Sequence, residues 1–289
     1  MARPDLPSFD LVVASVDRTT ELEGLLASLE RQTHRRFRVV LVDQNADDRL
    51  APALAEHPGL DLLHLRSERG LSRARNRALP ELRADLVTFP DDDCAYADDL
   101  LERVATRLGS DSALEGLSGR VVGRDGSSSA SWKRDTAVLT DDNLWNRVNS
   151  AALFLRRELV DAAGPFDERL GLGSGEPWSS GEEVDLLIRA VRSGARIAYD
   201  PELTVIHDEP QLDPDGLRAL GRRDGASVGY LLRKHRYPAR VVARMLTRPV
   251  GGALASLLHG DVTRARFHLA TLRGRSAGLR GAGPARGSR

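Results

Sequence analysis

Short apolar runs alternate with amphipathic stretches along the first part of the chain, and this alternation predicts strands and helices in turn. The four expected strands cover residues 9–15, 37–43, 60–65 and 85–89. Strands that alternate with helices in this way form a parallel sheet with helices on both faces. We therefore expect an α/β fold, built on a Rossmann-like, mostly parallel sheet flanked by helices.

The second half of the chain is less regular and then becomes helical. Further strands are expected at residues 114–122, 148–155, 197–199 and 204–206, and amphipathic helices over 216–235, 238–258 and 261–273. From Gly274 onward the Gly, Arg, Ala and Ser composition is typical of disorder. These patterns predict an α/β domain over residues 1–212, a basic helical appendage over 213–275 and a disordered tail over 276–289.

The formal net charge of zero hides a strong asymmetry. Residues 1–217 hold 26 Lys and Arg against 40 Asp and Glu, whereas residues 218–289 hold 16 against 2. Basic residues beside an apolar helical stripe are the signature of a helix that lies on a membrane. We expect the tail to bind an anionic membrane surface; the alternative is that its arginines pair with the acidic part of the chain.

The remaining composition indicates a globular protein of a reducing compartment. Cys94 is the only cysteine, so no internal disulfide can form. The first residues lack the apolar core of a signal peptide, and no run approaches the ~20 apolar residues of a membrane span. We expect a cytoplasmic protein, with peripheral attachment to the inner face of the cell membrane through its basic tail.

Three consecutive carboxylates, Asp91, Asp92 and Asp93, follow the fourth expected strand. Carboxylates fixed at a strand end suit a hard ion, Mg²⁺ or Mn²⁺, that leaves positions open for phosphate oxygens. The alternative is that they only cap the helix expected over residues 97–108. Further polar residues follow the ends of the first two strands, and the crossover rule places all of them on one edge of the sheet.

Six segments together resemble the family 2 glycosyltransferases of the GT-A fold, over roughly residues 8 to 210. Each segment alone is a weak signal, but their common order is specific. The segments are Ser15–Arg18, Val42–Asn45, Gly70–Asn76, Asp91–Asp93, Gly181–Leu186, and Tyr199 through His207.

The resemblance implies a metal-dependent transfer of a sugar with inversion. A divalent ion would be held by Asp93 with Asp91 and His207, and would stabilise the leaving pyrophosphate. Glu183 would be the general base for the acceptor hydroxyl, with the neighbouring Glu182 as the other candidate. Glu183 stands where the family has an aspartate, one methylene shorter.

The resemblance also assigns the donor pocket. Asp43 and Gln44 would hold the base, with Ser15 and Asp17 in the same pocket, and Gln44 stands where the family often has a second aspartate. The diphosphate would lie near Asp91 and Asp92, and Arg75 would meet the diphosphate or brace Asp43. Trp178 offers an aromatic face to a sugar ring, for acceptor or sugar binding; the alternative is that it simply packs in the protein.

The implied substrates are a UDP-, GDP- or dTDP-linked sugar and a saccharide or lipid-linked acceptor, as in the assembly of cell-surface polysaccharides or glycolipids. A nucleotidyltransferase shares the sheet and the metal, but Ser15–Arg18 lacks the glycines expected in its first loop. A non-catalytic scaffold subunit would have no need of the Asp93, Glu183 and His207 set. A nucleic-acid partner is not expected, because the acidic residues 1–217 repel phosphate backbones.

Overall fold

A computed structural model describes residues 6–128, 132–208 and 211–281 and divides the chain into two compact units. The sheet unit comprises Met1–Arg69, Arg73–Phe166 and Leu186–Glu209. The helical unit comprises Gly70–Ser72, Asp167–Asp185 and Pro210–Arg289. The helical unit thus contains the expected C-terminal appendage together with two earlier segments that the sequence placed in the first domain.

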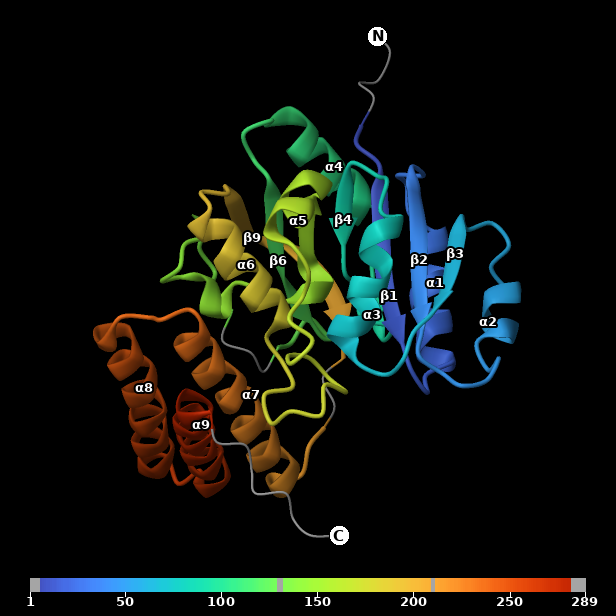
Figure 1. Ribbon diagram of the computed structural model, residues 1–289. Coiled ribbons are helices and arrows are strands. Elements are labelled where there is room, and N and C mark those ends of the chain that lie inside the picture. The colour runs from blue at the N-terminus through green and yellow to red at the C-terminus, as the bar shows by residue number, and fades with distance from the viewer. Residues whose placement is uncertain (1–5, 129–131, 209–210, 282–289) are drawn as a thin grey trace. The chain divides into compact units, whose positions relative to one another are not determined.

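One sheet of nine strands organises the sheet unit (Figure 1). Its order is β3-β2-β1-β4-β8-β6-β9-β5, with β7 paired to β9. The strands are β1 (Phe9–Ser15), β2 (Phe37–Asp43), β3 (Leu62–Arg66), β4 (Leu86–Thr88), β5 (Cys94–Ala95), β6 (Gly116–Val122), β7 (Ala137–Val138), β8 (Leu153–Arg156) and β9 (Ile197–His207). Strands β1 to β4 are parallel as predicted, and β8 runs antiparallel between β4 and β6, so the sheet is mixed.

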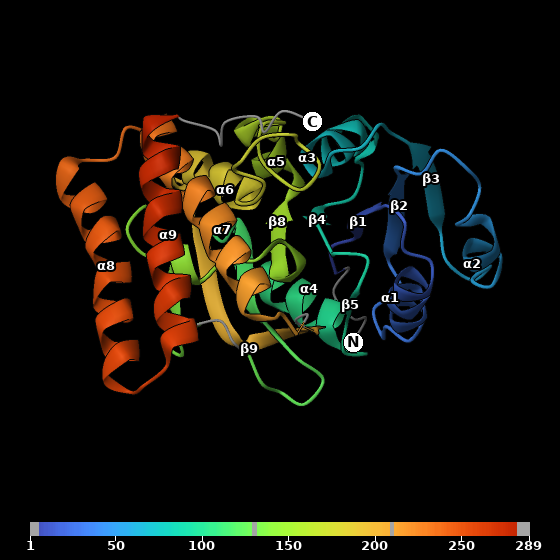
Figure 2. The same cartoon turned by 90° about the horizontal axis from the view of Figure 1, so that it is seen from below.

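Helices cover both faces of this sheet, as Figures 1 and 2 show. The helices that line the sheet unit are α1 (Thr20–Glu30), α2 (Ala51–Ala55), α3 (Leu71–Ala78), α4 (Leu100–Ser110), α5 (Arg157–Ala163) and α6 (Glu182–Arg192). Short 3₁₀ turns lie at Leu79–Glu81, Leu144–Asn146 and Ser150–Ala152. The α/β architecture inferred from the apolar periodicity is therefore confirmed.

Alternate residues of the central strands supply two separate hydrophobic cores. In β2, Val39 and Leu41 pack with α1 and α4, whereas Val40 and Val42 pack with α3, α5 and α6. Successive strand side chains point to opposite faces, so a strand buried on both faces is apolar without interruption. This is why β1 and β2 appear in the sequence as continuous apolar runs.

Strand β9 is longer than the sequence indicated. Residues 197–199 and 204–206, expected as two strands, belong to one strand that continues through Pro201. The register with β6 shifts between Ser118 and Arg120, and a Cβ on the intervening Gly119 would collide with the Leu203 carbonyl oxygen. The missing side chain lets the two backbones approach, and Arg120 Nε donates a hydrogen bond to the Pro201 carbonyl at 2.6 Å.

Three long helices dominate the helical unit: α7 (Pro214–Lys234), α8 (Ala239–Leu258) and α9 (Val262–Arg280) (Figure 2). Helices α7 and α9 approach very closely along glycines spaced four residues apart. Gly221, Gly225 and Gly229 of α7 meet the backbone of Phe267, Thr271 and Arg275, respectively. The residue numbers rise in the same direction along both helices, so the helices are parallel. Gly274 and Gly278 of α9 make the reciprocal approach.

A proline in α8 is compensated by an arginine of α9. Pro249 has no N–H, so the carbonyl of Met245, four residues earlier, cannot form its usual helical bond. Arg275 is largely buried and donates a hydrogen bond from Nη1 to that carbonyl. Burial lowers the pKa of Arg275 to about 10. The guanidinium therefore replaces the donor that the proline lacks and joins α8 to α9.

The structure corrects two expectations about the C-terminal region. Helix α9 continues to Arg280, so the tail expected to be disordered from 276 is helical up to that residue, because Gly274 and Gly278 are helix contacts. Residues 282–289 lie outside the described part of the chain. Among the described helices, α8 has the length and apolar composition that could cross a membrane, contrary to the expectation of no such run, although soluble core helices pass the same test.

We predict that alanine has opposite effects at two helical glycines. Gly225→Ala should lower the free energy of unfolding by about 1–3 kcal/mol, because its Cβ would collide with the Thr271 carbonyl oxygen. Gly251→Ala in α8 meets no atom within 4 Å and should raise stability by up to about 1 kcal/mol through helix propensity. Urea unfolding of both variants measures the difference; equal effects would contradict the close packing of α7 on α9.

Candidate functional site

The carboxyl ends of three parallel strands place polar residues in a row. Strand β1 pairs with β2 on one side and with β4 on the other, and Asp43 lies opposite Ser15 in register. Beyond β4, Asp91 forms a parallel bridge with Ala14 of β1. Ser15, Asp43 and the acidic run are therefore neighbours at one edge of the sheet, as the sequence predicted.

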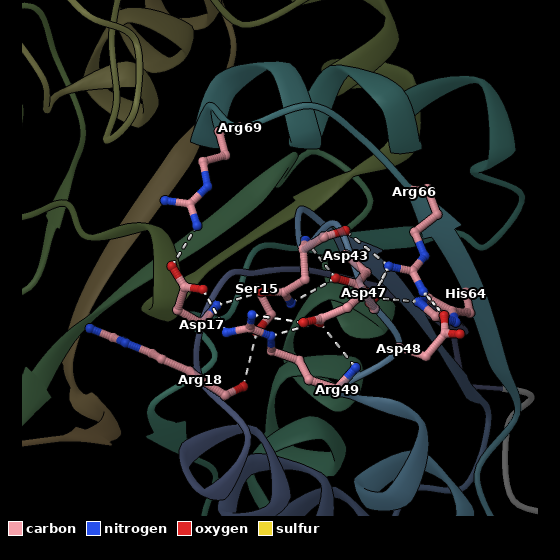
Figure 3. A network of polar contacts seen from close by, with 11 residues as sticks. Ser15, Asp17, Arg18, Asp43, Asp47, Asp48, Arg49, His64, Arg66 and Arg69 are labelled. Carbon is pink, nitrogen blue, oxygen red and sulfur yellow. Dashed lines mark hydrogen bonds and ion pairs between the residues drawn. The ribbon is translucent and has the colours of Figure 1, made fainter.

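Asp43 is fully buried, and both of its carboxylate oxygens make polar contacts (Figure 3). Its Oδ1 accepts hydrogen bonds from the backbone N and from Nδ2 of Asn45, both at 2.8 Å. Its Oδ2 lies 3.1 Å from His64 Nε2 and 3.1 Å from Arg66 Nη1. Both Asp43 oxygens thus hold the loop after β2, and the expected contact of Asp43 with a nucleotide base stays a prediction.

Gln44 follows Asp43 and is anchored by its backbone, whose N–H donates to the Ser15 carbonyl at 2.9 Å. Its side chain is 8% exposed. The main-chain bond joins the loops after β1 and β2, so Gln44 is positioned from both strands. The expectation that Gln44 holds a nucleotide base remains a prediction.

Asp17 bridges the first loop to two arginines. Its backbone has a positive φ of 60°, and its N–H donates to Asn45 Oδ1 at 2.8 Å. Its carboxylate lies 2.8 Å from Arg49 Nη1 and 2.6 Å from Arg69 Nη2, as Figure 3 shows. This unusual backbone conformation, held by Asn45, turns the Asp17 carboxylate toward the basic residues that follow β2 and β3.

Arg18 neutralises two members of the acidic run. One guanidinium nitrogen, Nη1, lies 2.9 Å from Asp92 Oδ1 and also contacts Asp93 Oδ2. Burial raises the pKa of Asp92 to about 6, although Ser15 and Arg18 oppose the shift. Burial also raises the pKa of Asp93, but contacts with His207 and Arg18 outweigh it, and the net shift is downward. Asp93 is the more readily ionised of the two carboxyl groups.

His207 reaches the same carboxylate from the last strand. Strands β5 and β9 are antiparallel, with His207 opposite Cys94, so the ring lies beside Asp93. The distance between His207 Nε2 and Asp93 Oδ1 is 3.0 Å, and this contact raises the pKa of His207. Cys94 itself is buried, which raises the pKa of its thiol well above the usual value.

Asp91 faces a different cation. Arg75 is almost completely buried, with its guanidinium 5.6 Å from the ring centroids of both Phe89 and Phe166, and its Nη2 lies 3.5 Å from Asp91 Oδ1. Among the described residues, no three His, Cys, Asp or Glu side chains form a group that could hold a metal ion. The predicted set is thus assembled only in part: Asp93 and His207 meet, and Asp91 turns to Arg75.

The second acidic segment, at the start of α6, belongs to the helical unit. Glu182 is 4% exposed and Glu183 is half-buried. Asp185 is fully buried and lies 2.8 Å from His235 Nε2 and 2.7 Å from Lys234 Nζ. Asp185 therefore anchors the end of α7, and Glu183 is the more accessible of the two glutamates.

Trp178 does not present an exposed aromatic face. It is 2% exposed and stacks on Tyr230, with 4.8 Å between ring centroids and 10° between planes. Arg169 lies over both rings, 5.5 Å and 5.3 Å from their centroids. The proposed sugar-binding role is therefore corrected to packing within the helical unit, because α7 supplies the partner that the local sequence could not indicate.

Several residues of the network were not identified from the sequence. They share one signal, which is that each follows the carboxyl end of a parallel strand: Arg18 after β1, Asn45 and Arg49 after β2, and Arg66 and Arg69 at or after β3. His64 within β3 carries no such signal. The sequence marked the acidic residues of this edge, whereas their basic partners became evident only from the contacts.

A family model described as Glycosyl transferase family 2 matches residues 10–160. The pre-mycofactocin glycosyltransferase of Mycobacterium tuberculosis is 28% identical over 215 residues, which cover 68% of this chain and 42% of that protein. The PGL/p-HBAD biosynthesis glycosyltransferase of Mycobacterium bovis is 28% identical over 172 residues, covering 56% and 64%. The succinoglycan biosynthesis protein ExoM of Rhizobium meliloti is 26% identical over 210 residues, covering 70% and 67%. The match spans less than two thirds of the length of the first two relatives.

Solved structures share the fold at low sequence identity. The mannosyltransferase PcManGT from Pyrobaculum calidifontis, in complex with GDP-Man and Mn²⁺, has a TM-score of 0.68 at 17% identity, covering 96% of this chain and 88% of that one. Residues 1–349 of TarS from S. aureus in complex with UDP have a TM-score of 0.56 at 18% identity, covering 95% and 92%. These likenesses establish the GT-A fold of the chain.

We predict that removing the charge of a carboxylate beside Arg66 lowers the stability of the protein only where that carboxylate is buried. Asp43→Asn should lower the free energy of unfolding by about 3 kcal/mol, because a buried carboxylate with four contacts loses its charge. Asp48→Asn makes the same change at an exposed partner of Arg66 and should leave stability nearly unchanged. Urea denaturation compares the two; equal losses would refute the positioning role of Asp43.

Proposed function

Because this chain belongs to glycosyltransferase family 2, we propose that it transfers a sugar from a nucleoside diphosphate to an acceptor hydroxyl, with inversion at the sugar carbon. The observation that carries the proposal is the row of strand-end carboxylates, Ser15 and Gln44 at one edge of the parallel sheet. Ligands of open α/β sheets bind at this edge, where loops from several strands converge. The same edge carries the arginines that an anionic donor requires.

The donor is a nucleotide sugar in this proposal. PcManGT has been solved with GDP-Man and TarS with UDP, and both share the fold of this chain. Gln44 can donate and accept hydrogen bonds to a base edge, and Asp17 is joined to the same loop through Asn45. Arg18, Arg49 and Arg69 already pair with carboxylates there, and they are close enough in the network to exchange those partners for phosphate oxygens.

A divalent cation, Mg²⁺ or Mn²⁺, fits the residues around Asp93. Asp93 Oδ1 is buried and accepts no well-oriented hydrogen bond from the described residues, although His207 Nε2 lies 3.0 Å away. Asp93 and His207 would hold the ion, and Asp91 would join them only by leaving Arg75; PcManGT was solved with Mn²⁺. When bound, such an ion would offset the negative charge of the departing diphosphate. Oxygen and imidazole donors suit these metals.

Glu183 is the proposed general base that accepts the proton of the attacking hydroxyl. Its greater exposure favours it over Glu182, and its place at the first turn of α6 puts the carboxylate where the helix dipole favours the ionised form. A single base with no protein nucleophile corresponds to one displacement and inversion. Asp185, which contacts Lys234 and His235, keeps the start of the helix in place for this role.

The acceptor is inferred from the relatives. One relative carries the name succinoglycan biosynthesis protein and another PGL/p-HBAD biosynthesis glycosyltransferase, and these names support a role in building a cell-surface polysaccharide or glycolipid. The proposed acceptor is a saccharide or lipid-linked sugar with a free hydroxyl. Incubation with UDP-, GDP- and dTDP-sugars and Mn²⁺, followed by detection of the released nucleotide, identifies the donor.

We predict opposite changes in Mn²⁺ affinity for two variants of the acidic run. Asp93→Ala should abolish Mn²⁺ binding, measured by titration calorimetry, and donor turnover with it. Arg18→Gln removes a cation that competes for Asp92 and Asp93, so it should bind Mn²⁺ about tenfold more tightly in the absence of donor. Full turnover of Asp93→Ala in EDTA, or weaker binding by Arg18→Gln, would contradict this assignment.

We predict that Glu183→Gln retains donor binding and loses transfer by ~10²–10⁴-fold, because glutamine preserves the shape but cannot accept the proton. The matched control is Glu182→Gln, one residue away and more buried. Donor binding is measured by calorimetry and transfer by product formation with a saccharide acceptor. An inactive Glu182→Gln beside an active Glu183→Gln would move the base by one residue.

A further inference from the structure

Helix α8 exposes a stripe of large apolar side chains on the side away from its packed face. Val250, Leu254, Leu257 and Leu258 are 40%, 60%, 52% and 87% exposed, and their spacing puts them on one helical face. Val262, at the first turn of α9, is 50% exposed. The buried residues of α8 occupy the opposite face: Val241, Met245, Pro249, Ala253 and Ser256. The apolar stripe therefore does not take part in the packing of α8 within the helical unit.

Arginines accompany this apolar stripe. Arg240, Arg244 and Arg248 are exposed at four-residue spacing in the first half of α8, and Arg264 and Arg266 are exposed at the start of α9. Helical periodicity places the first three beside the apolar stripe on the solvent side. The stripe and these five arginines are named here the hairpin face. Positive charge therefore borders the apolar surface from both helices.

Negative charge is nearly absent from this part of the chain. After Asp224, the sequence contains a single acidic residue, Asp261. Asp261 is the N-cap of α9, and its Oδ1 accepts a hydrogen bond from the Arg264 backbone N at 2.8 Å. The positive end of the α9 dipole offsets the Asp261 carboxylate. The hairpin face is thus both apolar and strongly cationic.

We propose that the hairpin face binds the surface of an anionic lipid bilayer, with the apolar stripe of α8 in the interfacial region and the arginines at the lipid phosphates. An amphipathic helix with basic residues beside its apolar face lies in the plane of such an interface. A transmembrane placement of α8 is disfavoured, because one face of α8 is already buried against α9 and Arg244 and Arg248 interrupt its length.

Charge also distinguishes a bilayer from a second copy of the chain. In a two-fold symmetric dimer the same patch faces itself, so two strongly cationic surfaces would be brought together. Like charges brought together in this way oppose association. Lipid phosphates supply the opposite charge over the whole patch, and each arginine near an anionic surface strengthens binding by about fivefold, screened by salt.

The test is sedimentation of the full chain with lipid vesicles, without any sugar donor. Wild type should bind vesicles that contain phosphatidylglycerol, bind phosphatidylcholine vesicles much more weakly, and dissociate at high salt. Leu254→Ser/Leu257→Ser/Leu258→Ser should lose at least about tenfold in affinity. Arg240→Gln/Arg244→Gln/Arg248→Gln should lose about a hundredfold and most of the salt dependence.

A matched control removes exposed apolar side chains elsewhere. Val138 and Leu172 are 48% and 55% exposed, and Val138→Ser/Leu172→Ser should sediment like wild type. Circular dichroism and thermal unfolding confirm that each variant is folded, and analytical ultracentrifugation reports the oligomeric state. Because no donor is used, the result is independent of the proposed transfer reaction.

Three outcomes would overturn the proposal. The first is equal binding of wild type to anionic and neutral vesicles, or binding to neither. The second is unchanged vesicle binding by the folded triple-leucine variant. The third is a wild-type dimer that this variant converts to a monomer, which would make a second copy the occupant.

Discussion

The parallel pairing of β1 with both β2 and β4 is the constraint on which the site depends. It brings the ends of three strands to one edge, and with them carboxylates that would repel one another. The fold balances this charge with a cation for each: Arg66 at Asp43, Arg69 at Asp17, Arg75 at Asp91 and Arg18 at Asp92 and Asp93. The edge is therefore a set of ion pairs in which each carboxylate has an arginine partner.

The carboxylates of this edge differ in burial, and burial separates their roles. Asp43 is enclosed by Asn45, His64 and Arg66, so a change there alters the loop itself. Asp93 Oδ1 is buried and accepts no well-oriented hydrogen bond from the described residues. The pKa of Asp93 is also lower than that of Asp92. Enclosed carboxylates that hold the loops and more accessible carboxylates thus lie along the same strand ends. Such preorganisation spares the enzyme from ordering its site at the moment of reaction.

In the helical unit, α7 and α9 pack through close contact of their backbones and not through interdigitated side chains. Glycines at four-residue spacing let α7 and α9 touch along their backbones, a packing mode common between membrane helices. Asp167 and Asp185 then fix α7 through Tyr230, Lys234 and His235. Because small residues and buried ion pairs hold these helices, the large apolar residues of α8 remain available on its outer face.

The sequence by itself determined the elements that depend on local periodicity. The apolar runs of β1 and β2 and the leucine spacing of α1 are properties of neighbouring residues, and the alternation of strands with helices implied a common edge for Ser15, Asp43 and Asp91. Only the tertiary structure decided which of these side chains are enclosed. Asp43 pairs with Arg66, and Trp178 stacks on Tyr230 more than fifty residues away. The continuation of α9 through Gly274 likewise depends on α7. Burial and charge pairing arise between distant segments, so no local pattern encodes them.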